Sequence, residues 1–182
     1  MALTPGEKER VDAFLYPVVR KMATYDGKLY ALATSMNTFR VFYNVGAFED
    51  AGIGRAPETL EELETAIDKL FQFDERGYIA RAGFELGPWQ ALLLFPAFGG
   101  RFYDEQTGHF TCAAPANIRA LEWMCRLGRR YGVKQLRTFD LANQSYLSGA
   151  TDPFASGRVA MRLHGQWSVD IFERAMAEGL PR

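Results

Sequence analysis

Predicted helices alternate with short predicted strands along this 182-residue chain, and this alternation limits its fold more than any other feature. The clearest helix begins at Thr59. There Thr59-Leu-Glu-Glu62 is a capping box, in which Glu62 is placed to reach back to the first free backbone amide. Apolar residues then recur at helical spacing as far as Phe71, which gives this helix a core face. The pattern predicts an α/β fold with helices packed around a short mixed sheet.

The other elements follow from apolar periodicity and from the positions of proline and glycine. Predicted helices cover residues 5–22 with an interruption at Pro17, 48–51, 89–98, a segment from Pro115, and 166–178; predicted strands cover 28–34, 40–44, 82–86 and 159–163. A polar turn is expected at 103–108 and a loop with short helical turns at 137–156. The expected buried face of the helix after Pro115 consists of Ile118, Leu121, Met124 and Cys125.

The composition is that of a globular protein, with 48% hydrophobic and 24% charged residues. A formal net charge of −1 offers no basic surface for nucleic acid or for a membrane. No apolar stretch is long enough to span a bilayer. The first ten residues lack the apolar core of a signal peptide, so we expect either a cytoplasmic protein or a chain that starts after its natural signal.

The two cysteines, Cys112 and Cys125, have no metal-ligand spacing around them, and only His109 and His164 could assist. The sequence therefore predicts neither a metal site nor a cofactor. A disulfide between the cysteines stays open in an oxidising compartment, but two buried thiols are favoured because Cys125 falls on the predicted apolar face.

Acidic residues give no sign of catalysis. Asp104 and Glu105 are adjacent on a polar turn, while Glu85 and Asp152 lack any motif around them. A glycosidase needs two carboxylates placed across one bond, and the chain also has no nucleophile elbow and no phosphate-cradling glycine loop. These acids are therefore expected to be solvated at the surface, and the chain is predicted not to be an enzyme.

Six short phrases resemble, in order and spacing, those of the family 1 extracellular solute-binding proteins, the sugar-binding receptors of bacterial ABC importers that include maltose-binding protein. The phrases are residues 26–32, Tyr43-Asn44, 48–52, 57–62, Gly99-Gly100 and 154–167. The resemblance covers about residues 24–178. The sequence departs from the family where Ala33 replaces a frequent proline, Leu60 a tryptophan and Arg158 a lysine.

The resemblance implies most of the C-terminal lobe of a type II periplasmic-binding-protein fold. Residues 1–36 would be the tail of the N-terminal lobe with a hinge-side strand, and residues 37–182 a C-terminal lobe that is incomplete at its end. The implied function is non-catalytic capture of a carbohydrate between two lobes by hinge closure. The implied partners are the ABC permease subunits in the membrane, and the protein would be a monomer located outside the cytoplasm, in the periplasm or as a lipoprotein.

Sugar sites combine aromatic plates with oriented polar groups, because a sugar ring has apolar faces and a rim of hydroxyls. Trp167, just after Gly165, is the leading candidate plate, and Trp89 falls where relatives carry an aromatic that touches ligand. Core packing is the alternative role for both. Further candidates are Asn37, Thr38, Gly99, Gly100 and Gly165, with Gln166 and Tyr103 secondary. Turn chemistry could account for Asn37 and Thr38, and helix termination for the two glycines.

Two other functions remain open at this stage. A binding protein for glycerol phosphate or another small polar solute would place arginines in the pocket, and Arg40 and Arg101 are the candidates. A self-standing carbohydrate-interaction domain unrelated to transport is the second alternative.

Overall fold

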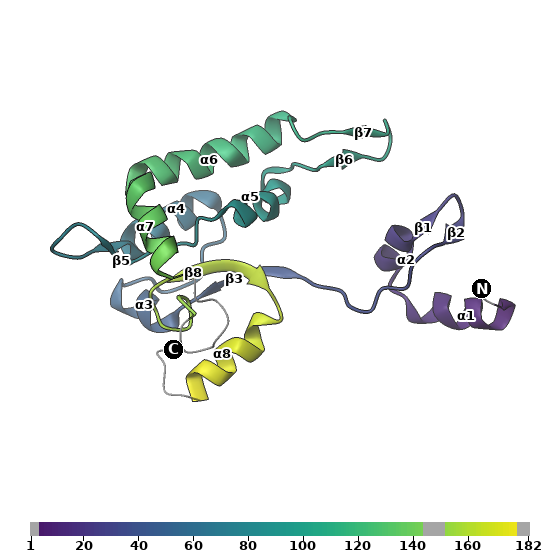
Figure 1. Ribbon diagram of the computed structural model, residues 1–182, viewed down its shortest axis with the longest axis horizontal. Helices are drawn as coiled ribbons and strands as arrows, with labels where there is room; N and C mark the ends of the chain where they lie inside the picture. The colour runs from purple at the N-terminus through teal and green to yellow at the C-terminus, as the bar shows by residue number, and fades with distance from the viewer. Residues whose placement is uncertain (1–3, 144–151, 178–182) are drawn as a thin grey trace. The chain divides into compact units, whose positions relative to one another are not determined.

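The computed structural model describes residues 4–143 and 152–177, and the chain divides into two compact units that meet after Thr38 (Figure 1). The first unit contains α1 (Pro5–Phe14), α2 (Pro17–Ala23), β1 (Thr24–Tyr25) and β2 (Lys28–Leu29). The assignment of residues 1–36 and 37–182 to two lobes stays a prediction.

Pro17 divides the helix predicted over residues 5–22, because proline is tolerated in the first turn of a helix but not in its interior. The strand predicted over 28–34 forms only at Lys28–Leu29, where it pairs with Thr24–Tyr25 across a tight turn. That part of the prediction is wrong, because a strand extends only where a neighbour supplies hydrogen bonds. No described residue of this unit is buried.

The second unit carries the mixed α/β core, and the predicted fold class is confirmed. Its helices are α3 (Val45–Asp50), α4 (Leu60–Leu70), α5 (Pro88–Leu94) continued by the 3₁₀ turn η1 (Phe95–Phe98), α6 (Pro115–Tyr131), α7 (Val133–Ala142) and α8 (Ser168–Ala177). Its strands are β3 (Phe39–Tyr43), β4 (Gln72–Phe73), β5 (Ile79–Arg81), β6 (Tyr103–Asp104), β7 (His109–Phe110) and β8 (Met161–Gly165).

An antiparallel ribbon of β3 and β8 runs through the middle of this unit, from the pair Phe39 and Gly165 to the pair Tyr43 and Met161. Figure 1 shows α8 on one side of the ribbon and α4, α5 and α6 on the other. Ala82 forms a parallel bridge with Val159 next to β8, so residues predicted as the strand 82–86 contribute a single bridge and not a strand.

Two sequence predictions about α6 and α7 are wrong. The buried face of α6 is formed by Trp123, Leu127 and Tyr131, whereas Leu121 and Cys125 are exposed. The face is rotated by about one residue, because the larger stripe at i, i+4 and i+8 fills the core.

Cys112 and Cys125 are both free and exposed, contrary to the expectation of buried thiols. The first part of the predicted loop 137–156 is helical, because it belongs to α7.

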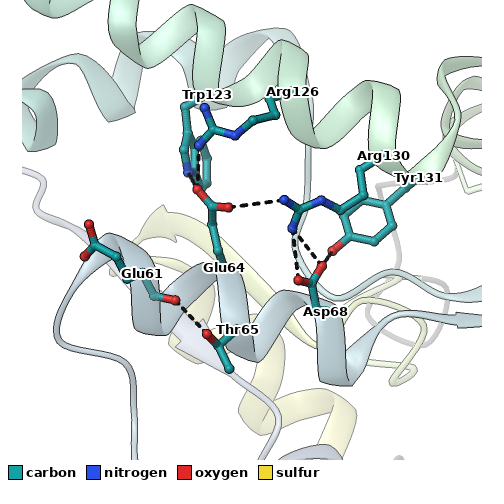
Figure 2. Close-up of polar contacts among 8 residues, drawn as sticks. All are labelled: Glu61, Glu64, Thr65, Asp68, Trp123, Arg126, Arg130 and Tyr131. Atoms are coloured by element: carbon teal, nitrogen blue, oxygen red, sulfur yellow. Dashed lines mark hydrogen bonds and ion pairs between the residues drawn. The ribbon is translucent and has the colours of Figure 1, made fainter.

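Polar contacts join α4 to α6 at the rim of the core (Figure 2). Glu64 accepts hydrogen bonds from the indole Nε1 of buried Trp123 at 2.7 Å and from Arg126 at 2.6 Å. Asp68 pairs with Arg130 at 2.9 Å and accepts a hydrogen bond from the Tyr131 hydroxyl, and burial together with Asp68 raises the pKa of that hydroxyl. One face of α4 thus fixes the rotation of α6 that places Trp123 in the core.

Replacing Glu64 with Ala should lower the free energy of unfolding by about 1–2 kcal/mol, because the buried Trp123 indole loses its acceptor. Urea denaturation followed by far-UV circular dichroism measures the change. Glu61→Ala, at an exposed position on the same helix, is the control and should change stability by less than about 0.5 kcal/mol. Equal losses in the two variants would contradict a specific role for Glu64.

Candidate ligand-binding site

Trp167 lies just beyond the open end of the β3–β8 ribbon, between β8 and α8. Its indole folds back over Gly165: a Cβ atom at position 165 would lie 1.9 Å from the indole Cζ3. No side chain larger than hydrogen therefore fits at 165 while the indole keeps this position. The close approach expected at Gly165 is an approach by the protein's own tryptophan.

Two aromatic rings hold the indole from its sides. Phe39, the cross-strand partner of Gly165, packs edge-on against Trp167 with ring centroids 5.6 Å apart and an interplanar angle of 87°. His164 makes a second tilted contact at 5.2 Å. Trp167 nevertheless keeps 42% of its surface exposed, so it is not a fully buried core residue, which was its alternative role. A fixed, half-exposed indole provides a flat apolar surface suited to stacking.

His164 connects this aromatic group to the first turn of α8. Its Nδ1 is hydrogen-bonded to the hydroxyl of Ser168, which is almost completely buried. Burial and the nearby positive charge of Arg162 lower the pKa of His164 below its ordinary value. The ring next to Trp167 is therefore neutral at neutral pH, and it holds the indole without presenting a charge.

Trp89 is the second residue of α5, whose first turn is fixed by its neighbours. Gln90 accepts a hydrogen bond from the Gly87 amide at 3.0 Å and donates one to Glu85 at 2.9 Å. The backbone of this turn is thus well defined, while a ligand contact by Trp89 stays a prediction.

The remaining predicted site residues have different surroundings. Gly99 adopts φ +77° and ends η1, and a Cβ on Gly100 would lie 1.9 Å from Oδ1 of the buried Asn117, so both glycines have a local structural reason. Asn37 and Thr38 are exposed at the end of the first unit, and Gln166 is exposed beside Trp167. Among the described residues of the second unit, Gly165, Gln166 and Trp167 lie together, and ligand contact by any of the eight candidates stays a prediction.

An apolar cavity lies elsewhere in the second unit. It has a volume of about 600 Å³ and is lined mainly by apolar residues of β3, α3 and α8. Its aromatic lining residues are Phe42, Tyr43, Phe154 and Phe172. No predicted site residue lines this cavity, whose polar lining side chains include Asn44 and Glu49.

Partly buried Glu85 and buried Asp152 are partners of one arginine, so the expectation that they are solvated surface acids is wrong. Arg162, only 3% exposed, lies 3.0 Å from Glu85 and 2.7 Å from Asp152. Asp152 also accepts hydrogen bonds from the amides of Phe154 and Ala155. Burial raises the pKa of Glu85, an effect that Arg162 opposes. Both carboxylates are thus held in an ion pair with Arg162.

Sequence reasoning missed Phe39, His164 and Arg162. Alternation along β3 places Arg40 on the opposite face from Phe39, and its guanidinium donates to the Phe39 carbonyl. Tyr103 is the first residue of β6, and Arg101 lies just before it. The β6–β7 hairpin is away from the ribbon (Figure 1). A polar residue just before an exposed tryptophan was the only signal that could have drawn attention to His164.

Metal and membrane sites find no support in the described ranges. No cluster of three or more histidine, cysteine or acidic residues there could hold a metal ion. None of the helices in residues 4–143 and 152–177 has the length and apolar character needed to cross a membrane.

The chain belongs to the bacterial extracellular solute-binding protein family, whose model matches residues 6–179. No curated protein sequence matches it. The family membership confirms the resemblance seen in the sequence phrases, and the members are binding proteins.

Solved structures show the fold that the chain shares. CpMnBP1 with mannobiose bound superposes with a TM-score of 0.81 at 24% identity, covering 97% of this chain and 46% of that one. The *Thermus thermophilus* maltotriose binding protein bound with maltotriose gives a TM-score of 0.63 at 22% identity, covering 96% and 45%. The chain therefore has the fold of these sugar-binding proteins over somewhat less than half of their length.

A Gly165→Ala substitution should move the Trp167 indole, because the new methyl group would occupy its place. We expect a changed near-UV circular dichroism spectrum and a red-shifted tryptophan emission, with the far-UV spectrum unchanged. Gly54→Ala is the control, since a Cβ there meets nothing within 4 Å. Unchanged near-UV spectra in Gly165→Ala would contradict the packing described.

His164 should make stability depend on mildly acidic pH. Its pKa is lower in the folded chain than in the unfolded chain, so its contribution is present above the ordinary histidine pKa and is lost as pH falls through the lowered value. Urea unfolding at a series of pH values should show this loss in the wild type and a smaller one in His164→Gln. Parallel curves for the two proteins would show that His164 has no such role.

Proposed function

We propose that this chain forms one wall of a carbohydrate-binding site, as part of the solute-binding component of an ABC importer. The observation that carries the proposal is the half-exposed Trp167 indole, which Phe39 and His164 fix at the end of the ribbon. Apolar C–H faces of a pyranose stack on such a surface. Similar structures with mannobiose and maltotriose bound support a sugar as the ligand.

The flat apolar surface of the Trp167 indole favours a neutral sugar over a phosphate. The neighbouring His164 is neutral at neutral pH, and its cross-strand partner Arg40 donates to the Phe39 carbonyl at 2.8 Å. A phosphate site would need a cation or several free amides directed at one point. We therefore do not favour glycerol phosphate, and a free-standing carbohydrate domain has no observation that favours it.

The rest of the function follows from the same proposal. The site would be non-catalytic, since the buried carboxylates are committed to Arg162. A second wall, contributed by a facing lobe, would complete the pocket, and hinge closure would hold the sugar through contacts from both sides. The protein would work outside the cytoplasm as a monomer and deliver its ligand to permease subunits in the membrane.

The three tryptophans of the chain make the proposal directly testable. In a ¹⁵N-labelled sample titrated with mannobiose, we expect the indole N–H signal of Trp167 to shift while that of the buried Trp123, bonded to Glu64, stays fixed. Titration with glycerol 3-phosphate tests the alternative ligand. A shift with the phosphate alone, or with neither compound at millimolar concentration, would overturn the proposal.

The affinity of the 182-residue chain should be low, because it supplies only one wall of the pocket. Isothermal calorimetry with mannobiose or maltotriose should give a dissociation constant weaker than about 1 μM, the value that corresponds to about −8 kcal/mol. Binding at micromolar or better affinity would show that one wall suffices and that our account of the partial site is wrong.

A further inference from the structure

We propose that Arg162 is a positioning residue for the ligand site: its buried guanidinium fixes the segment that begins α5 relative to the strand that ends at Gly165 and leads to Trp167. The inference rests on the function proposed above. Arg162 is a buried charged residue in β8, and its two neighbours in the strand are the apolar Met161 and Leu163.

The contacts of Arg162 reach in two directions from the centre of β8. On one side its Nη1 donates to Asp152 at 2.7 Å, and Asp152 in turn caps the amides of Phe154 and Ala155 at 2.9 and 3.0 Å. On the other side its Nε lies 3.0 Å from Oε2 of Glu85, and Nη2 donates to Oε1 at 3.3 Å. A planar guanidinium can serve both carboxylates at once, which a lysine ammonium on a single flexible stem does less well.

From Glu85 the chain of hydrogen bonds continues into α5. Glu85 accepts from the side-chain amide of Gln90 at 2.9 Å, and the carbonyl of that amide accepts from the Gly87 backbone amide at 3.0 Å. The Glu85 backbone amide also donates to the Met161 carbonyl at 3.0 Å. The first turn of α5, which contains residue 89, is therefore tied through side chains and backbone to the same strand that carries Trp167.

The energetic context favours a positioning role over a gain in stability. Removing charges from water is unfavourable, and apolar residues of similar volume often stabilise a core as well as a buried ion pair does. A buried pair does, however, require one defined geometry of its partners. Here the partners are the two segments that hold the predicted aromatic positions 89 and 167.

The test compares two variants that each lose an inter-element contact. Glu85→Gln removes the charge that holds α5 to Arg162, and Glu64→Ala removes the contact between α4 and α6 at a position remote from the ribbon. We expect Glu85→Gln to weaken mannobiose binding about tenfold, as the loss of one charge-assisted contact would. Glu64→Ala should destabilise the chain but leave affinity within about twofold of the wild type.

A second readout does not depend on sugar. Loss of the Glu85 charge should shift the backbone amide signals of both Gly87 and Gly165, whereas Glu64→Ala should shift neither. If Glu85→Gln and Glu64→Ala have equal effects on affinity and on these signals, Arg162 is only a structural residue. If the wild type fails to bind mannobiose but the two amides still shift together, the proposed function fails and the coupling stands.

The pH dependence separates positioning from stability as well. The groups that face Glu85 are Arg162, Asp152 and Asp140, and burial raises the pKa of Glu85. As pH falls, Glu85 is protonated earlier in the folded chain than in the unfolded one, so its contribution to stability increases while its ion pair weakens. Affinity should therefore fall where the Glu85 contribution to stability rises, and Glu85→Gln should lack this step. Affinity and stability that change together would contradict the proposal.

Discussion

The antiparallel pairing of β3 with β8 is the interaction on which the second unit depends. It joins the beginning of that unit to its last strand, so that α8, which follows β8, lies on one side of the ribbon and α4, α5 and α6 from the intervening sequence lie on the other (Figure 1). The same register sets Phe39 opposite Gly165 and thereby determines what the Trp167 indole can contact. A register shift by one residue would turn Phe39 to the other face and remove one of the two rings that hold the indole.

Two groups of charged residues in this unit have different physical roles. The contacts of Glu64 and Asp68 with α6 are partly exposed, so solvent screens them and each contributes little beyond the hydrogen bond to Trp123. Arg162 lies in the core, where an unpaired charge would be very costly. The first group orients a helix, while the second requires three distant segments to meet in one arrangement.

The sequence predicted those elements that carry their own local signals. The capping box at Thr59 marks the start of α4 correctly, with Glu62 accepting from the Glu58 amide one residue earlier than expected. Apolar residues alone did not determine which face of α6 is buried, because both candidate stripes are apolar and the choice depends on the partner helix. Likewise, no pattern near Glu85 in the sequence predicts its contact with Arg162, which lies 77 residues further along the chain.

The candidate site was predictable only in part for the same reason. Trp167 and Gly165 stand out in the sequence because tryptophan and glycine are distinctive after a strand. The structure adds that the glycine makes room for the indole, a relationship that the sequence alone did not predict. In the sequence, Phe39 and His164 are ordinary strand residues. The register places Phe39 across from Gly165, and His164 lies beside the Trp167 indole.

The fit between Gly165 and Trp167 also has a consequence for evolution. Because the indole occupies the space of the missing side chain, position 165 can change only after or together with position 167. Homologues that have replaced the tryptophan with a small residue are free to carry alanine or serine at 165, while those that keep it are not. The two positions should therefore covary as a pair, and the glycine should be the later of the two to be lost.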